Sequence, residues 1–184
     1  MTKMVSRRPF VGWWECFLEK PIYTLPMNQS WAGALLISSN GEILGVGSLF
    51  VQDTAFPGTI SLGNMFVPIN LLKSILNDLI RYGRRKKDVK LYIGISTNVS
   101  SGKVIITRVS KKGPAEKSGL KKNDIIKTVN GKAVNSVQMF YKIIWSSGNY
   151  GVEIDFQIIR NKKDLSFKVK SVDRMDYLIK NKSY

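Results

Sequence analysis

A run of 24 residues at positions 113–136, GPAEKSGLKKNDIIKTVNGKAVNS, constrains the fold of this chain more than any other feature. Pro114 opens a short helix, because its fixed φ suits the first helical turn and its missing N–H is not needed there. Gly119 ends that helix, and a strand is expected over 124–129. An Asn-Gly pair after the strand favours a tight turn, because both residues tolerate positive φ. The run therefore predicts a helix, a strand and a turn in that order.

The residues around this run alternate between apolar and polar, which is typical of strands. A second helix is expected from Ser136, its N-cap, to Trp145, with Phe140 and Ile144 four residues apart on one face. Five strands and two helices suit a small, partly open barrel. The five expected strands cover 90–95, 103–110, 124–129, 152–160 and 165–172.

The first part of the chain, up to about residue 69, also predicts short strands bounded by Gly, Pro and Asn. They cover 21–26 and 65–69, with a hairpin over 34–50 that turns at an Asn-Gly pair. A single helix is then expected from its cap Asn70 to a stop at Gly83, because apolar residues recur there at spacings of three and four.

The segment GPAEKSGLKKNDIIKTVNGKAVNS closely resembles the core signature of a PDZ domain. With LYIGI before it and the longer helix after it, the order resembles the circularly permuted PDZ domain of bacterial HtrA/Deg-type serine proteases. The resemblance covers residues 89–172. Upstream, QSWAGAL at 29–35 and GNMFVP at 63–68 resemble parts of the second barrel of the trypsin-like domain in the same family.

The resemblance implies a mainly β, α+β chain, in which a partial trypsin-like β-barrel is followed by the permuted PDZ domain. We expect the barrel remnant and its helix over 1–83 and a basic linker over 84–89, most simply a solvated boundary. The PDZ domain then covers 90–173 and a C-terminal tail covers 174–184. The family's first barrel, which carries its histidine and aspartate, has no counterpart among these residues.

No catalytic residue is expected. Aligning AGAL with the family's Gly-Gly-Pro-Leu puts Trp31 at the position of the nucleophilic serine, and an indole offers no nucleophile. Ser30 is one residue early, and a hydroxyl needs an adjacent base to react. The chain has no histidine, and its single cysteine, Cys16, excludes an internal disulfide and a cysteine zinc cage. The prediction is a degenerate protease with no metal and no cofactor.

The resemblance implies that the PDZ part binds C-terminal peptides or unfolded segments of partner proteins. The last residues of a bound C-terminal peptide add a strand to an exposed sheet edge. Gly94 leaves room for a terminal carboxylate to approach backbone N–H groups, Lys90 adds charge nearby, and the accepting edge runs over 95–99. The same residues are also compatible with a plain half-buried strand and a core helix face. The predicted carboxylate loop is Tyr92, Ile93, Gly94 and Ile95, and the predicted groove wall is Val137, Tyr141 and Ile144.

Two further functions stay open beside peptide binding, and one of them follows from the charge of the chain. The formal net charge is +16 and the sequence pI about 10.0, which attracts anions of every kind without naming one. The alternatives are a basic adaptor for nucleic acid or acidic membrane, and a serine endopeptidase fragment that needs an upstream half. Nucleic acid is the less favoured partner, because no nucleic-acid-binding motif is present. No membrane span or signal peptide is expected in these residues. The cellular compartment is therefore not predicted. A periplasmic or envelope location follows only if an intact parent protein resembles HtrA/Deg proteins.

Overall fold

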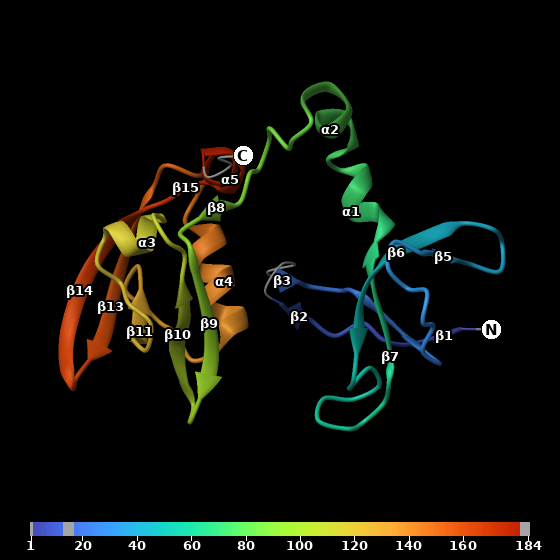
Figure 1. Ribbon diagram of the computed structural model, residues 1–184, viewed down its shortest axis with the longest axis horizontal. Coiled ribbons are helices and arrows are strands. Elements are labelled where there is room, and N and C mark those ends of the chain that lie inside the picture. The colour runs from blue at the N-terminus through green and yellow to red at the C-terminus, as the bar shows by residue number, and fades with distance from the viewer. Residues whose placement is uncertain (1, 13–16, 181–184) are drawn as a thin grey trace. The chain divides into compact units, whose positions relative to one another are not determined.

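The computed structural model describes residues 2–12 and 17–180, so Cys16 and residues 181–184 lie outside this part. The chain divides into two compact units, Met1–Gly83 and Arg84–Tyr184, which we call unit 1 and unit 2 (Figure 1). Among the described residues, no helix is long and apolar enough to span a membrane.

Unit 1 contains an open five-stranded antiparallel sheet in the order β1-β4-β7-β6-β5, which confirms the expected partial barrel (Figure 1). Its outer strands β1 and β5 each pair on one side only, and β2 and β3 form a separate two-stranded sheet. The strands are β1 (Lys3–Ser6), β2 (Phe10–Val11), β3 (Phe17–Leu18), β4 (Ile22–Leu25), β5 (Leu35–Ile37), β6 (Ile43–Val51) and β7 (Gly63–Pro68).

The predicted hairpin over 34–50 is confirmed, since β5 and β6 pair antiparallel. Gly41 takes a φ of 81° at the turn, and its N–H donates to the Ser38 carbonyl at 3.1 Å. A glycine adopts this left-handed conformation without steric cost, which explains why the chain reverses there.

The predicted single helix after residue 69 is wrong in one respect, because two short helices replace it: α1 (Ile69–Lys73) and α2 (Leu76–Tyr82). The N-cap of α1 is Pro68 rather than Asn70. Between the helices, the Ser74 hydroxyl donates to the Leu71 carbonyl at 2.9 Å, a local bond that competes with helix continuation. The predicted stop is confirmed, with Gly83 at a φ of 64°.

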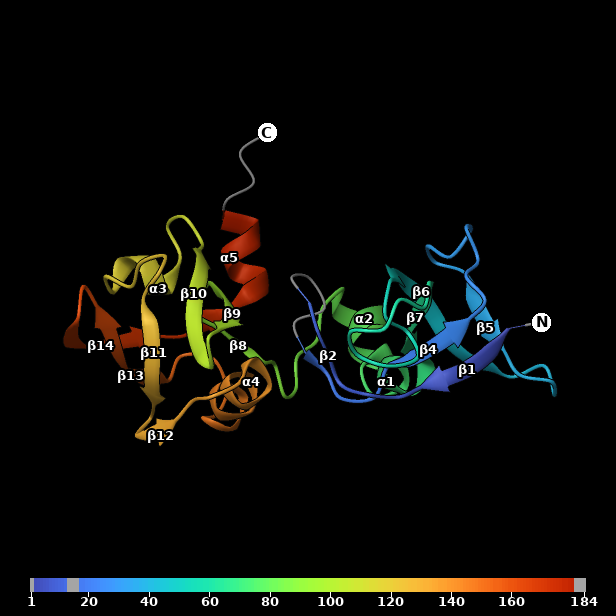
Figure 2. The same cartoon turned by 90° about the horizontal axis from the view of Figure 1, so that it is seen from below.

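Unit 2 is built on a six-stranded antiparallel sheet in the order β14-β13-β11-β10-β9, with β12 paired to β11 (Figures 1 and 2). A second pairing joins β15 to β8. The elements are β8 (Leu91–Tyr92), β9 (Ile95–Ser100), β10 (Lys103–Val109), α3 (Pro114–Lys117), β11 (Ile125–Val129), β12 (Lys132–Ala133), α4 (Val137–Ser146), β13 (Glu153–Arg160), β14 (Lys163–Lys170), β15 (Val172–Asp173) and α5 (Arg174–Lys180).

One cluster of buried apolar side chains, from Leu91 to Val169, forms the core of unit 2. The helix α4 begins as predicted, because the Ser136 hydroxyl accepts from the Met139 N–H at 3.1 Å. The carboxylate of Asp124 is 1% exposed and receives two bonds from the Arg160 guanidinium, at 2.6 and 2.7 Å. This bidentate pair ties the start of β11 to the end of β13.

The segment 174–184, expected as a tail, carries α5 over its described part. The helix follows β15 directly, and it lies beside β8, where the Tyr177 ring is 5.2 Å from the Tyr92 ring (Figure 1). The boundary expected near residue 173 therefore falls between two elements of unit 2 that follow each other without a break.

Candidate functional site

The strand expected over 90–95 is interrupted by Ile93 and Gly94, which separate β8 from β9. Gly94 has a φ of 80°, and a Cβ at this position would lie 3.3 Å from the Cβ of Ser110. The chain can turn here because glycine accepts both constraints. The turn is held from inside, since the Ser110 N–H donates to Gly94 at 2.7 Å and the Ala115 N–H donates to Ile93 at 2.9 Å.

These internal bonds use the carbonyls of the loop and leave its donors free. Within the described residues, the N–H groups of Ile93 and Gly94 have no hydrogen-bond acceptor. Both residues are buried, and unpaired buried N–H groups are rare in proteins. The loop therefore offers two donors to a ligand.

The strand that follows this loop is an edge strand. β9 pairs with β10 on one side, and α4 runs beside it (Figures 1 and 2). Thr97 lies in β9, and its buried hydroxyl has no partner among the described residues. We call this region, the 93–94 loop with β9 and the adjacent face of α4, the β9–α4 surface.

The helix face beside β9 differs from the predicted wall at one position. Val137 and Tyr141 are half-buried and one turn apart. Ile144 is only 2% exposed and belongs to the core, so we leave it out of the candidate surface. The next position at a spacing of four is Trp145, whose half-buried ring lies 5.2 Å from that of Tyr141. Trp145 was not among the predicted wall residues, although its spacing of four residues from Tyr141 is a sequence signal that favours it.

The exposed Lys90 lies at this same end of α4. Its ammonium is 5.7 Å from the centre of the Trp145 ring, a cation–π distance. The structure thus brings Lys90 to the helix face and places the positive charge beside the aromatic pair.

Tyr92, the first residue of the predicted loop, is held by α5. Its ring lies 5.2 Å from that of Tyr177, and its hydroxyl is 2.8 Å from the Ser110 hydroxyl. The Tyr177 hydroxyl donates to the Lys111 carbonyl at 2.8 Å, and burial raises the pKa of Tyr177. Sequence reasoning missed this support, because Tyr92 and Tyr177 are far apart in the chain and no local pattern links them.

Arg84, in the predicted linker, is part of the same support. Its guanidinium pairs with Asp173 and, at 2.8 Å, with Asp176. The hydrogen bond to Asp176, together with the bond and charge of Asp173, raises the pKa of Arg84. The first residue of the basic run therefore anchors β15 and α5 instead of only solvating a boundary.

In unit 1, the loop aligned with a protease nucleophile is a tight turn. The Ala34 N–H donates to the Trp31 carbonyl at 3.0 Å. The Gly33 N–H donates to the Gly47 carbonyl at 2.9 Å, and the Gly47 N–H donates to the Ala34 carbonyl at 2.8 Å. Trp31 is half-buried. Ser30 is exposed, and its N–H donates to the Asn28 side chain at 3.0 Å.

Known proteins carry the same parts. A PDZ domain model matches residues 92–171. The HtrA Do-like serine protease of Lactobacillus helveticus is 29% identical over 78% of this chain and 38% of its own length. The DegS serine endoprotease of Haemophilus influenzae is 32% identical over 64% of this chain and 34% of its own length. The chain thus spans about a third of these relatives. A periplasmic serine endoprotease DegP of Escherichia coli is 25% identical over 60% of the chain and 24% of its own length.

Solved structures agree. A serine endoprotease from Yersinia pestis, 25% identical, superposes with a TM-score of 0.52 over 84% of this chain and 52% of its own. The HtrA-type protease AlgW with a tripeptide, 17% identical, has a TM-score of 0.52 over 84% of this chain and 53% of its own, a likeness of fold. Residues 92–171 are a PDZ domain, and the chain is homologous to the C-terminal part of HtrA-type serine proteases.

Proposed function

We propose that unit 2 binds the free C-termini of partner proteins on the β9–α4 surface, and that the chain has no proteolytic activity of its own. The observation that carries the first part is the pair of unpaired N–H groups at Ile93 and Gly94, next to the open edge of β9. A terminal carboxylate accepts charge-assisted hydrogen bonds from such donors. The peptide backbone then continues as a strand along β9.

The half-buried side chains of α4 select the last side chain of the peptide. Val137 and Tyr141 present half-buried apolar surface to the last side chain of the peptide, and Tyr141 with Trp145 extends that surface. The expected ligand therefore ends in an apolar residue. Because such contacts are few and exposed, the affinity is about micromolar or weaker, roughly −8 kcal/mol or less favourable.

The direct test compares two fluorescent peptides that differ only in a free or an amidated C-terminus. We expect the acid to bind and the amide to lose most of the affinity, because amidation removes the charge that the 93–94 loop recognises. Equal affinity for both forms would rule out the carboxylate loop. Repeating the titration at a higher salt concentration separates a basic adaptor, whose affinity falls steeply with salt.

Two pairs of variants locate the site. Gly94→Val should abolish binding, because its φ of 80° strains a β-branched residue and its side chain fills the approach to the loop. Gly131→Val is the matched control, with a φ of 73° and no atom within 4 Å of its Cβ. Tyr141→Ala should weaken binding without unfolding unit 2, whereas Met139→Ala, on an exposed part of α4, should not.

The absence of peptidase activity rests on Trp31 at the nucleophile position and on a sequence without histidine. We expect no labelling by a serine-directed fluorophosphonate and no cleavage of unfolded protein. Trp31→Ser alone should not restore activity, because no general base takes the proton. Stoichiometric labelling that disappears in Ser30→Ala would contradict this proposal.

One observation favours a second candidate, an endopeptidase fragment completed by another polypeptide. The outer strand β5 leaves Leu35 and Ile37 more than half exposed, at 52% and 57%. A complementing barrel would cover them. Mixing the chain with the separately produced upstream half of an HtrA-type protease tests this candidate. We expect activity only if Trp31→Ser is also made, and activity with Trp31 in place would favour the fragment.

A further inference from the structure

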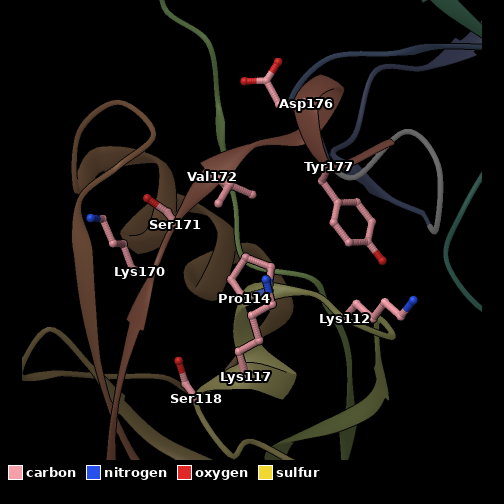
Figure 3. Close-up of a pocket in the computed structure, with 9 residues that line it drawn as sticks. All are labelled: Lys112, Pro114, Lys117, Ser118, Lys170, Ser171, Val172, Asp176 and Tyr177. Carbon is pink, nitrogen blue, oxygen red and sulfur yellow. The ribbon is translucent and has the colours of Figure 1, made fainter. Parts of the chain in front are cut away.

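A cavity of about 510 Å³ opens in unit 2 between α3, the end of β14, β15 and α5 (Figure 3). It contains none of the residues predicted for peptide binding. Its apolar wall comes from Pro114, Val172 and Tyr177, which belong to three separate elements. The volume is within the range of small-molecule sites in proteins, about 300–1,000 Å³.

Three lysines, Lys112, Lys117 and Lys170, border this cavity (Figure 3). Their side chains are exposed, and within the described residues none has a carboxylate within ion-pair distance. Asp176, the acid among the described residues that line the cavity, pairs with Arg84 at 2.8 Å, and the nearby Glu116 carboxylate accepts from the Lys112 backbone N–H at 2.7 Å. The cavity therefore combines an apolar wall with a positively charged border.

The charge of the chain is concentrated in the same unit. Residues 84–184 hold 23 of the 29 Lys and Arg residues and 8 of the 13 Asp and Glu residues, which leaves a formal charge of +15 there. A positive field of this size draws small anions toward the unit, and the apolar wall selects those that also carry an apolar group.

We propose that this cavity binds a small amphipathic carboxylate, with the apolar chain against Pro114, Val172 and Tyr177 and the carboxylate among the three lysines. Lysine suits this role because its flexible stem covers apolar surface while the ammonium reaches an anion at the border. A nucleic acid fits less well, since its phosphates need an extended basic surface and not an apolar hollow. The inference does not depend on peptide binding at the β9–α4 surface.

The test titrates the full chain with decanoate, followed by amide chemical shifts. Two probes isolate the two requirements: acetate keeps the carboxylate without the chain, and decyltrimethylammonium keeps the chain with the opposite charge. We expect saturable decanoate binding with shifts at Ser118, Ser171 and Tyr177, and no saturable shifts there with either control probe.

Charge reversal on the border gives the matched variants. Lys117→Glu and Lys170→Glu should each weaken decanoate binding by about five-fold or more, because attraction becomes repulsion at the carboxylate. Lys132→Glu, on exposed β12, changes the net charge equally but does not border the cavity, so its affinity should stay within about two-fold. Thermal unfolding curves verify that each variant is folded.

The titrations give different results if the cavity binds decanoate and if it does not. Weaker binding in both border variants and unchanged binding in Lys132→Glu support the site. Equal affinity in all three variants, saturable binding of decyltrimethylammonium, or shifts confined to the exposed apolar residues of unit 1 would overturn it. If Lys170→Glu unfolds, the result with Lys117→Glu decides alone, because Lys117 is exposed at the end of α3.

Discussion

The two units are of similar length, but they differ in how many apolar side chains they bury. In unit 2, 16 buried apolar side chains form one cluster between the sheet and α4. In the described part of unit 1, five apolar residues other than proline and glycine are buried: Phe17, Ile22, Tyr23, Met65 and Phe66. Large apolar side chains such as Ile37 and Ile60 are exposed there, at 57% and 87%. Strands alone do not make a stable unit, because a sheet needs something to pack against.

The units also differ in charge and in what they offer to ligands. Unit 1 has a formal charge of +1 against +15 in unit 2. Unit 2 combines a closed core with free donors at one edge, whereas unit 1 has open strand edges at β1 and β5. Rigid elements hold binding groups more precisely, so the difference favours unit 2 as the place where ligands bind.

The largest expected difference between the units is their resistance to proteolysis. We expect thermolysin to cut unit 1 first and to leave a resistant fragment that contains unit 2, because local opening needs little energy where few apolar contacts close the structure. Mass spectrometry of the early fragments locates the first cuts. First cleavage inside residues 90–172 would show that unit 2 is the less stable unit.

Truncating one apolar side chain in each unit measures how much packing stabilises that unit. Phe156 is 1% exposed, so Phe156→Ala should cost about 3–5 kcal/mol and unfold unit 2 at a lower denaturant concentration. Leu35→Ala in unit 1, where the side chain is 52% exposed, should change stability by no more than about 0.5 kcal/mol. Hydrogen exchange measured by mass spectrometry follows each unit separately. A similar cost for the two substitutions would show that β5 is covered in solution.

The smallest expected difference concerns two ion pairs. Asp124 is 1% exposed and Arg160 is half-buried, so Asp124→Ala leaves a partly desolvated guanidinium without its bidentate partner and should cost about 2–3 kcal/mol. In unit 1, Asp53 pairs with Arg8 at 2.9 Å but is 40% exposed, so Asp53→Ala should cost about 1 kcal/mol or less. Denaturant unfolding of the two variants checks the order. Equal costs would mean that burial does not distinguish these pairs.

Much of the fold could be predicted from residues that act on their neighbours. Pro114, Gly119 and Ser136 begin or end helices where expected, and the PDZ order follows from them. The helix after residue 69 was predicted as one because its apolar spacing continues across the break. The local bond of Ser74 to Leu71 competes with that spacing, and a pattern of hydrophobicity does not register it.

The candidate site was predicted in outline but not in detail. Gly94 was predicted in the carboxylate loop from the family resemblance and from the room that a glycine leaves beside the backbone. Its φ of 80° is one that glycine adopts readily. Ile144 was placed on the wall because it is apolar and near the right turn, yet the core takes its side chain. Trp145 lies on the face instead, where its ring contacts Tyr141. The spacing of four from Tyr141 favours Trp145 over Ile144, and the packing of Ile144 into the core agrees with that spacing.

Most local elements follow from residues close together in the chain, because turns and helix caps are short-range features. The composition also excludes a histidine of this chain as a general base. The tertiary structure alone decided which carbonyls of the 93–94 loop are used and which N–H groups stay free. It also decided that Arg84 meets Asp173, 89 residues away. Such meetings depend on how all the elements pack, and no local pattern encodes the distance between two distant side chains.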